Sequence, residues 1–379
     1  FGAMGAKGKL PVSIDDEFKV NEGIETLEIK RLGFSIPENV GMNSKVLTKI
    51  DSIANYAISK KMTPGIQVVV ARKGKVIYQK SFGNHTYEST QKVNNTDVYD
   101  IASLTKIVAT LPNVMQEFDQ GHLTLETKLK TMLPEAKNSN KANATVLDML
   151  THQARFQPWI PFYKATLDSL NRPSTHFYRS EFSDEFPVHV ADKLYLRKNY
   201  NDTIVKTILD SELLPKKQYK YSDFTFILFK EYLELHNKKS LEDLAHANFF
   251  EPLGANSIMY NPLRKMNANR IIPTENDNYF RHQIVQGYVH DMAAAMQGGI
   301  SGHAGLFANA LDVAKVMQMF LQKGSYGGRT YISENTFNIF NTCYFCKDGN
   351  RRGVGFDKPQ LGNEGPTCGC VSLTSFDHT

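Results

Sequence analysis

The segment from Asp100 to Phe118 constrains the fold most, because it joins a helical pattern to two reactive side chains. Its apolar residues recur at positions that share one face of a helix. These residues are Leu104, Ile107, Val108, Leu111, Val114, Met115 and Phe118. Ser103 opens the predicted helix and Lys106 follows three positions later. We therefore expect the hydroxyl and the amine to lie one turn apart, near the positive end of the helix.

This spacing matters chemically because a serine hydroxyl is a poor nucleophile near neutral pH unless a base takes its proton. A lysine amine that loses its proton in a partly desolvated site can be that base. Ser103 and Lys106 thus predict a nucleophile and its base. The alternative is a helix cap followed by a solvent-exposed lysine, so the assignment depends on the rest of the chain.

A second candidate is Tyr221-Ser222-Asp223, which follows a lysine-rich loop and begins a predicted helix. A tyrosine hydroxyl near an ammonium group can pass a proton to or from a leaving group. The chain has 17 tyrosines, and most are expected to be packing groups, so chance is a real competitor for Tyr221.

Size and composition set limits on the fold and the partners. The 379 residues can form one large domain or two smaller ones, and a hydrophobic content of 41% allows a substantial core. The net charge of +5 is spread without a basic run, which argues against nucleic acid as a partner. No apolar stretch approaches the roughly 20 residues that span a membrane. The chain begins at Phe1 without a signal-peptide pattern, so we expect a piece of a longer product.

The four cysteines form two close pairs, Cys343-x-x-Cys346 and Cys368-x-Cys370. Paired cysteines can bind zinc, but C-x-C is a less usual half-site and no histidine stands at the matching spacing. A disulfide or free thiols are favoured, and the sequence does not choose between them. We predict no metal ligands and no cofactor.

The order of elements predicts an α/β (α+β) fold, with an antiparallel sheet flanked by helices and an inserted, mostly helical region. Residues 1–43 are expected to be a linker, and 44–379 one domain, with α/β parts at 44–99 and 285–379 and a helical part at 100–284. The predicted elements are a helix over 44–60, a buried strand over 65–72, a second strand over 76–82, a helix over 224–235, and strand-like segments over 329–332 and 353–356.

Five segments together resemble the serine β-lactamase-like family, in its class C, esterase and D-Ala-D-Ala carboxypeptidase branch. They are Ala102–Lys106, Met149–His152, Tyr221–Asp223, Glu251–Gly254 and Gly305–Phe307. The resemblance implies a serine hydrolase that forms an acyl-enzyme on an amide or ester. Ser103 would be the nucleophile, Lys106 and Tyr221 would move protons, and Asp223 would orient them.

The third motif of this family has two candidates in the chain. His303-Ala304-Gly305 matches the pattern, but it stands only 82 residues after Tyr221 (303 − 221), about half the usual separation. Ser375-Phe376-Asp377-His378-Thr379 lies 157 residues after it (378 − 221) and looks like the start of the expected strand. The resemblance therefore favours His378 as catalytic and Thr379 as substrate-binding, with His303 as the runner-up. Trp159 is a further candidate for substrate binding. Trp159 and the aromatic residues that follow it could instead face a partner, but ordinary pocket lining or core is favoured for them.

The resemblance also implies that the last strands of the family's sheet, and one oxyanion donor, lie beyond Thr379. We expect this segment alone to be unstable or nearly inactive. The residues Phe1-Gly2 and Gly8–Ser13 resemble the end of a family 3 glycoside hydrolase, so a fused upstream glycosidase is the expected covalent partner. The expected location is the periplasm or cell envelope of a bacterium. The alternative function is a non-catalytic module that binds penicillin or peptidoglycan peptides.

Overall fold

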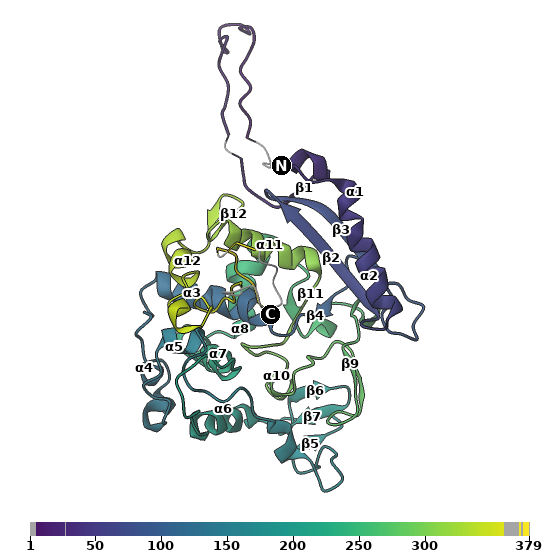
Figure 1. Ribbon diagram of the computed structural model, residues 1–379, viewed down its shortest axis with the longest axis vertical. Helices are drawn as coiled ribbons and strands as arrows, with labels where there is room; N and C mark the ends of the chain where they lie inside the picture. Colours follow the sequence, from purple (N-terminus) through teal and green to yellow (C-terminus); the bar gives the residue numbers. More distant parts are fainter. Residues whose placement is uncertain (1–4, 27, 360–370, 373, 379) are drawn as a thin grey trace.

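The computed structural model describes residues 5–26, 28–359, 371, 372 and 374–378. Helices make up most of its regular structure (Figure 1). The α-helices are α1 (Ser44–Leu47), α2 (Lys49–Ser59), α3 (Leu111–Asp119), α4 (Leu129–Met132), α5 (Val146–Leu150), α6 (Tyr200–Asp210), α7 (Phe224–Asn237), α8 (Leu241–Ala245), α9 (Glu251–Leu253), α10 (Met292–Met296), α11 (Ala310–Leu321) and α12 (Glu334–Phe340).

The strands are short, apart from one hairpin. They are β1 (Gly33–Phe34), β2 (Gly65–Arg72), β3 (Lys75–Gly83), β4 (Tyr99–Asp100), β5 (Tyr178–Arg179), β6 (Val188–Ala191), β7 (Leu194–Leu196), β8 (Met259–Tyr260), β9 (Glu275–Asp277), β10 (Gln283–Val285), β11 (Leu306–Ala308), β12 (Ser325–Tyr326) and β13 (Arg329–Thr330).

The hairpin of β2 and β3 forms the main sheet. The two strands are antiparallel with a bulge after Val70, and β1 adds in parallel to the far edge of β3. Helices α1 and α2 lie along one side of this hairpin, whereas α11 lies against β2 (Figure 1). Among the described strands, β2 pairs with β3 alone, so its other edge faces the body of the molecule.

The helical body is built around α3 and α7, which pack against one another. The sequence of α7 is apolar on nearly every face, as expected for a helix surrounded by protein. Its residues Phe224, Leu228 and Phe229 are completely buried, and so are Leu111 and Val114 of α3. The core therefore sits between α3 and α7, and the segments that lead into these two helices carry the candidate catalytic residues.

A small sheet fixes the chain just before Ser103. Strand β11 lies between β4 and β8, and both pairings are antiparallel. Asp100 pairs with Phe307 in this sheet, and the Ile101 amide then donates to the Leu306 carbonyl at 3.0 Å. The nucleophile segment is thus held to β11, about 200 residues away in sequence.

The structure agrees with much of the predicted fold and corrects some of it. The bounds of β2 match the predicted strand, but most of its residues are only partly buried, so the prediction of a buried strand was wrong. The predicted helix over 44–60 is divided at Thr48 into α1 and α2. Residues 353–356 form no strand; only Asp357 makes an isolated bridge, to Asp377. The predicted helical part also contains the β5–β7–β6 sheet.

Two ends of the described chain differ in character. Residues 5–26 form an extended projection with few contacts to the body, closed by pairing of Leu10 with Glu22 and of Ile14 with Phe18 (Figure 1).

The first of the two cysteine pairs is oxidised: Cys343 and Cys346 form a disulfide, whereas the pair at 368 and 370 lies outside the described residues. No described helix is long and apolar enough to cross a bilayer.

Candidate active site

Ser103 sits in a tight turn that presents it at the start of a helix. Ala102, just before it, has a φ of +45°, a left-handed conformation that costs free energy for a residue with a side chain. Asp100 stabilises the turn, because its carboxylate accepts from the Ala102 amide at 2.8 Å and from the His290 amide at 2.6 Å. The helix then passes through a π-helical turn, Lys106–Thr110, before α3. Such π-helical turns are frequent at functional sites.

Lys106 connects the nucleophile to the rest of the site. Its side chain is 1% exposed, and its Nζ lies 2.8 Å from Ser103 Oγ and 2.7 Å from Asp223 Oδ1. Nζ also donates to the carbonyl of His303 at 3.2 Å. Three acceptors thus fix the amine within reach of the hydroxyl, which is the geometry that proton transfer requires.

Tyr221 approaches Ser103 from the segment just before α7. Its hydroxyl lies 3.2 Å from Ser103 Oγ, and Lys106 Nζ lies 5.0 Å from the centre of its ring. The Lys106–Asp223 ion pair then joins the N-terminal end of α7 to the helix that follows Ser103. The nucleophile therefore has an amine and a phenol within hydrogen-bonding distance of one oxygen.

His378 lies beside the phenol of Tyr221 and near the backbone of Ser103. Its Nε2 lies 3.4 Å from the Tyr221 hydroxyl, and the two rings stack with centroids 6.1 Å apart. Burial, together with the charges of Lys106 and Arg352, lowers the pKa of His378 to about 3. A neutral imidazole at this position can donate a hydrogen bond to the phenol or accept one from it, and it adds no positive charge to the site.

His303 has a different position from His378. Its imidazole is buried and lies 2.8 Å from both Asp291 Oδ1 and Ser301 Oγ. Burial alone would raise the pKa of Asp291, but the charge and hydrogen bond of His303 lower it. Only the backbone carbonyl of His303 contacts Lys106. His303 therefore supports the lysine, whereas His378 faces the tyrosine.

Of the two predicted substrate-binding residues, Trp159 lies among the described residues and Thr379 does not. Trp159 is 55% exposed and lines a small pocket of about 30 Å³ that also reaches Asp223, Asp291 and His303. The pocket lies beside the ion pair of Lys106, so Trp159 borders the site next to Asp223, and Ser103 does not line this pocket. Thr379 lies outside the described residues.

Two residues of the site were not predicted. The His152 ring packs 4.7 Å from the Tyr221 ring, and burial with nearby positive charge lowers its pKa well below the usual range. Arg352 is 1% exposed and its guanidinium lies 5.9 Å from the Tyr221 ring centre. His152 ends the segment Met149–His152, which contributed to the family resemblance, so the sequence could have indicated that it lies near the site. No local pattern around Arg352 indicated that this residue lies there.

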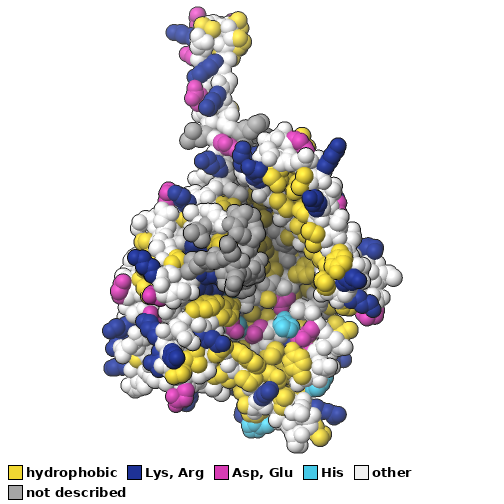
Figure 2. All heavy atoms as spheres, viewed as in Figure 1, with side chains coloured by type: hydrophobic (Ala, Val, Ile, Leu, Met, Phe, Trp, Pro, Cys, Tyr) yellow, Lys and Arg dark blue, Asp and Glu magenta, His cyan; other side chains and the backbone are white. Residues whose placement is uncertain are grey.

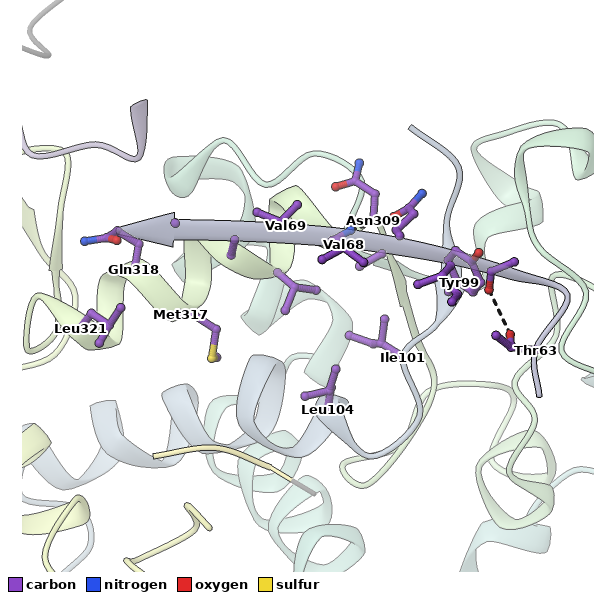
Figure 3. A pocket seen from close by; sticks show the side chains of 18 residues that line it. Thr63, Val68, Val69, Tyr99, Ile101, Leu104, Asn309, Met317, Gln318 and Leu321 are labelled. Atoms are coloured by element: carbon purple, nitrogen blue, oxygen red, sulfur yellow. Dashed lines mark hydrogen bonds between the residues drawn. The ribbon is translucent and has the colours of Figure 1, made fainter. Parts of the chain in front are cut away.

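A large apolar pocket, named here the β2 groove, lies beside the catalytic cluster and not in it. It has a volume of about 720 Å³ and runs between β2 and α11, with Ile101 and Leu104 at its base (Figure 3). Figure 2 shows hydrophobic side chains along the hollow between the hairpin and the body. Among the described residues that line it, only Tyr99 has a side chain suited to acid–base chemistry.

The arrangement around Ser103 defines a class of protein. A hydroxyl at a helix start, a buried amine at 2.8 Å and a phenol at 3.2 Å form a nucleophile with two proton carriers. The carboxylate of Asp223 orients the amine. This set of groups is that of a serine hydrolase that works through an acyl-enzyme on an amide or ester.

The family follows from comparison with known proteins. A family model described as Beta-lactamase matches residues 54–342, and the chain therefore belongs to the β-lactamase family. Its sequence is 27% identical to the N-acetylmuramyl-L-alanine amidase of Bacillus subtilis (strain 168), over 80% of this chain and 69% of the relative. It is 25% identical to a putative D-alanyl-D-alanine carboxypeptidase of Escherichia coli (strain K12), over 91% and 80%.

A solved structure shares the fold. The octameric penicillin-binding protein homologue from Pyrococcus abyssi superposes with a TM-score of 0.58 at 19% identity. The match covers 79% of this chain but only 60% of the archaeal protein. At this level of identity the likeness shows the fold alone.

Proposed function

We propose that the chain hydrolyses an amide bond beside an alanine residue in a peptidoglycan-type peptide, in the bacterial cell envelope. The observation that carries this proposal is that Ser103 Oγ lies within 3.2 Å of both Lys106 Nζ and the Tyr221 hydroxyl. The names of the two relatives support the substrate class. One denotes an amide between a muramyl group and L-alanine, and the other an amide between two D-alanines.

The reaction proceeds in two steps. With the Lys106 amine unprotonated, Ser103 Oγ attacks the amide carbonyl while Lys106 takes the hydroxyl proton, and the Ser103 amide contributes to binding the oxyanion. Tyr221 then passes a proton to the leaving amine, with Lys106 replenishing it through the cluster. Water attacks the acyl-enzyme and releases the acid. Asp223 holds Lys106 in place through both steps.

The proposal is tested by covalent labelling of Ser103. We expect the wild-type chain to react with a fluorescent penicillin or a fluorophosphonate, and Ser103→Ala to show no labelling with an unchanged circular dichroism spectrum. Ser59→Ala, at the exposed end of α2, is the control and keeps full labelling. Loss of the nucleophile lowers turnover by roughly 10⁶-fold in a well-studied serine hydrolase. Equal labelling of Ser103→Ala contradicts the assignment.

A substrate panel separates the activities that these groups support. It contains nitrocefin, p-nitrophenyl butyrate, a D-Ala-D-Ala peptide and an acetylmuramyl-L-alanine peptide. Pocket shape decides among them, because the catalytic groups are common to all. We expect turnover of one of the two peptides to exceed that of nitrocefin. A binding module instead predicts an acyl group that stays on Ser103 without turnover.

A further inference from the structure

Three side chains far from Ser103 converge in a way that the hydrolase reaction does not use. They are Glu117 near the end of α3, His122 in the turn after it, and His236 near the end of α7. Gly121, with a φ of +76°, makes the turn that returns His122 toward Glu117. Their chemistry is that of a metal site, since a carboxylate and two imidazoles are ligands that zinc takes in proteins.

The distances among the three ligand atoms fit this interpretation. His122 Nδ1 lies 2.9 Å from Glu117 Oε2, His236 Nε2 lies 3.3 Å from the same oxygen, and the two nitrogens are 3.2 Å apart. Ligands bound about 2.0–2.1 Å from a tetrahedral zinc ion lie about 3.3 Å from one another. The three atoms are thus spaced like one face of a zinc tetrahedron.

The burial and charge of Glu117 point the same way. Its side chain is only 5% exposed, and within the described chain its ion pairs are to histidines and not to lysine or arginine. A buried carboxylate needs a compensating charge, and a divalent cation supplies one. The histidine side chains are 41% and 39% exposed, which leaves the outer side of the cluster open to a water ligand.

Neighbouring residues hold the ligands as a metal site requires. Asn237 Nδ2 donates to Glu117 Oε1 at 2.9 Å and so directs the other oxygen toward the histidines. The Tyr232 ring stacks on His236 with centroids 5.5 Å apart. Outer-shell partners of this kind orient ligands and raise metal affinity.

A second group of potential ligands does not share these features. Asp223, Asp291 and His303 also lie close together. However, Lys106 already pairs with Asp223 at 2.7 Å, and His303 with Asp291 at 2.8 Å. These contacts already occupy the possible ligand atoms, so that group belongs to the catalytic cluster.

We propose that Glu117, His122 and His236 bind a zinc ion that joins the C-terminal ends of α3 and α7. The N-terminal ends of the same two helical segments are joined by the contacts of Lys106 and Tyr221 with Asp223 and Ser103. The ion would thus clamp the pair of catalytic helices at the end opposite the active site. Water would be the fourth ligand, on the open side of the cluster.

The test measures zinc binding to the full chain after dialysis against a chelator. We expect one zinc ion per chain by calorimetry and elemental analysis, and a Tm that rises with zinc concentration. Cobalt in place of zinc should give the visible absorption of a four-coordinate ion. Two ligand variants, Glu117→Gln and His236→Ala, should weaken zinc binding by more than the 10- to 100-fold that loss of an outer-shell partner costs. Asn237→Ala should fall within that range.

Controls keep the proposal falsifiable. His246→Ala removes an exposed histidine on another segment and should bind zinc as the wild type does. Labelling of Ser103 in each variant shows that the fold is intact, independently of zinc. The proposal is overturned if the wild-type chain binds no zinc at stoichiometric concentration. Equal affinity in the wild type and in His236→Ala overturns it as well, because the three side chains then share only protons.

Discussion

The catalytic cluster and the β2 groove lie side by side but are built in opposite ways. In the cluster, polar groups converge and form hydrogen bonds with one another. The single amine of Lys106 contacts Ser103, Asp223 and the His303 carbonyl. In the groove, apolar side chains of β2 and α11 face a hollow of about 720 Å³. The comparison shows that polar contacts hold the catalytic groups in one arrangement. The groove instead exposes apolar surface, and further burial of that surface would stabilise the folded protein.

The two regions meet at the segment that carries the nucleophile. Ile101 and Leu104 line the groove, and Ser103 between them faces the cluster. Packing changes in the groove can therefore reach the catalytic serine through its immediate neighbours. We expect changes in the cluster to alter rate with little change in stability, and changes in the groove to alter both.

After loss of the nucleophile itself, the largest effect is expected from Tyr221→Phe, which removes one oxygen from the cluster. Loss of a general acid–base group lowers kcat by about 10²- to 10⁴-fold. The free energy of unfolding should change by only about 1 kcal/mol, because the lost contacts are hydrogen bonds of the hydroxyl alone. Steady-state kinetics and urea unfolding measure the two quantities.

A matched variant makes this test specific. Tyr219→Phe removes a hydroxyl two residues away, from a side chain that is 42% exposed. It should leave kcat unchanged. A Tyr221→Phe enzyme with wild-type kcat would show that the phenol transfers no proton in the rate-limiting step.

The next effect concerns the groove. We predict that Ala314→Leu, which enlarges an apolar side chain in the lining of the groove, buries more apolar surface there. The variant should bind less of the dye ANS than the wild type, and its Tm should be higher. Its turnover should change by less than that of Tyr221→Phe. Equal dye binding and equal Tm in Ala314→Leu and the wild type would contradict this prediction.

Local patterns predicted much of the fold because the physical causes are local. The apolar run of β2 and the periodicity after Ser103 are determined by neighbours within a few residues. The partial burial of β2 was missed because it depends on what lies across the sheet. The π-helical turn at Lys106–Thr110 was also missed, since a wider turn leaves the apolar periodicity nearly unchanged.

The candidate site divides in the same way. Ser103, Lys106, Tyr221 and Asp223 stand in short motifs, and the structure places them together. Contacts between residues far apart in the chain left no pattern in the sequence. Arg352 and Tyr221 are 131 positions apart (352 − 221), and His236 and Glu117 are 119 positions apart (236 − 117). Pairing at such separations follows from tertiary packing, which a single sequence does not record.

The smallest effect is expected in the dependence of stability on pH. The pKa of His378 falls from 6.5 to about 3 on folding, so the folded chain keeps this imidazole neutral. Above pH 6.5 both states are neutral, and the contribution to stability is fully present. As the pH falls from 6.5 toward 3, the unfolded chain binds a proton that the folded chain does not, and stability is lost. The loss is up to about 1.4 kcal/mol per pH unit.

His378→Gln should remove this contribution. The curve of unfolding free energy against pH should then be shallower between pH 6 and 4, by about the slope that the proton of one histidine contributes. His152, whose pKa is also lowered, keeps its own share in the same direction in both proteins. His282→Gln, at an exposed histidine, is the control and should follow the wild-type curve. Urea unfolding at several pH values measures the slope. An unchanged slope in His378→Gln would mean that this imidazole is solvated and does not pack against the Tyr221 phenol.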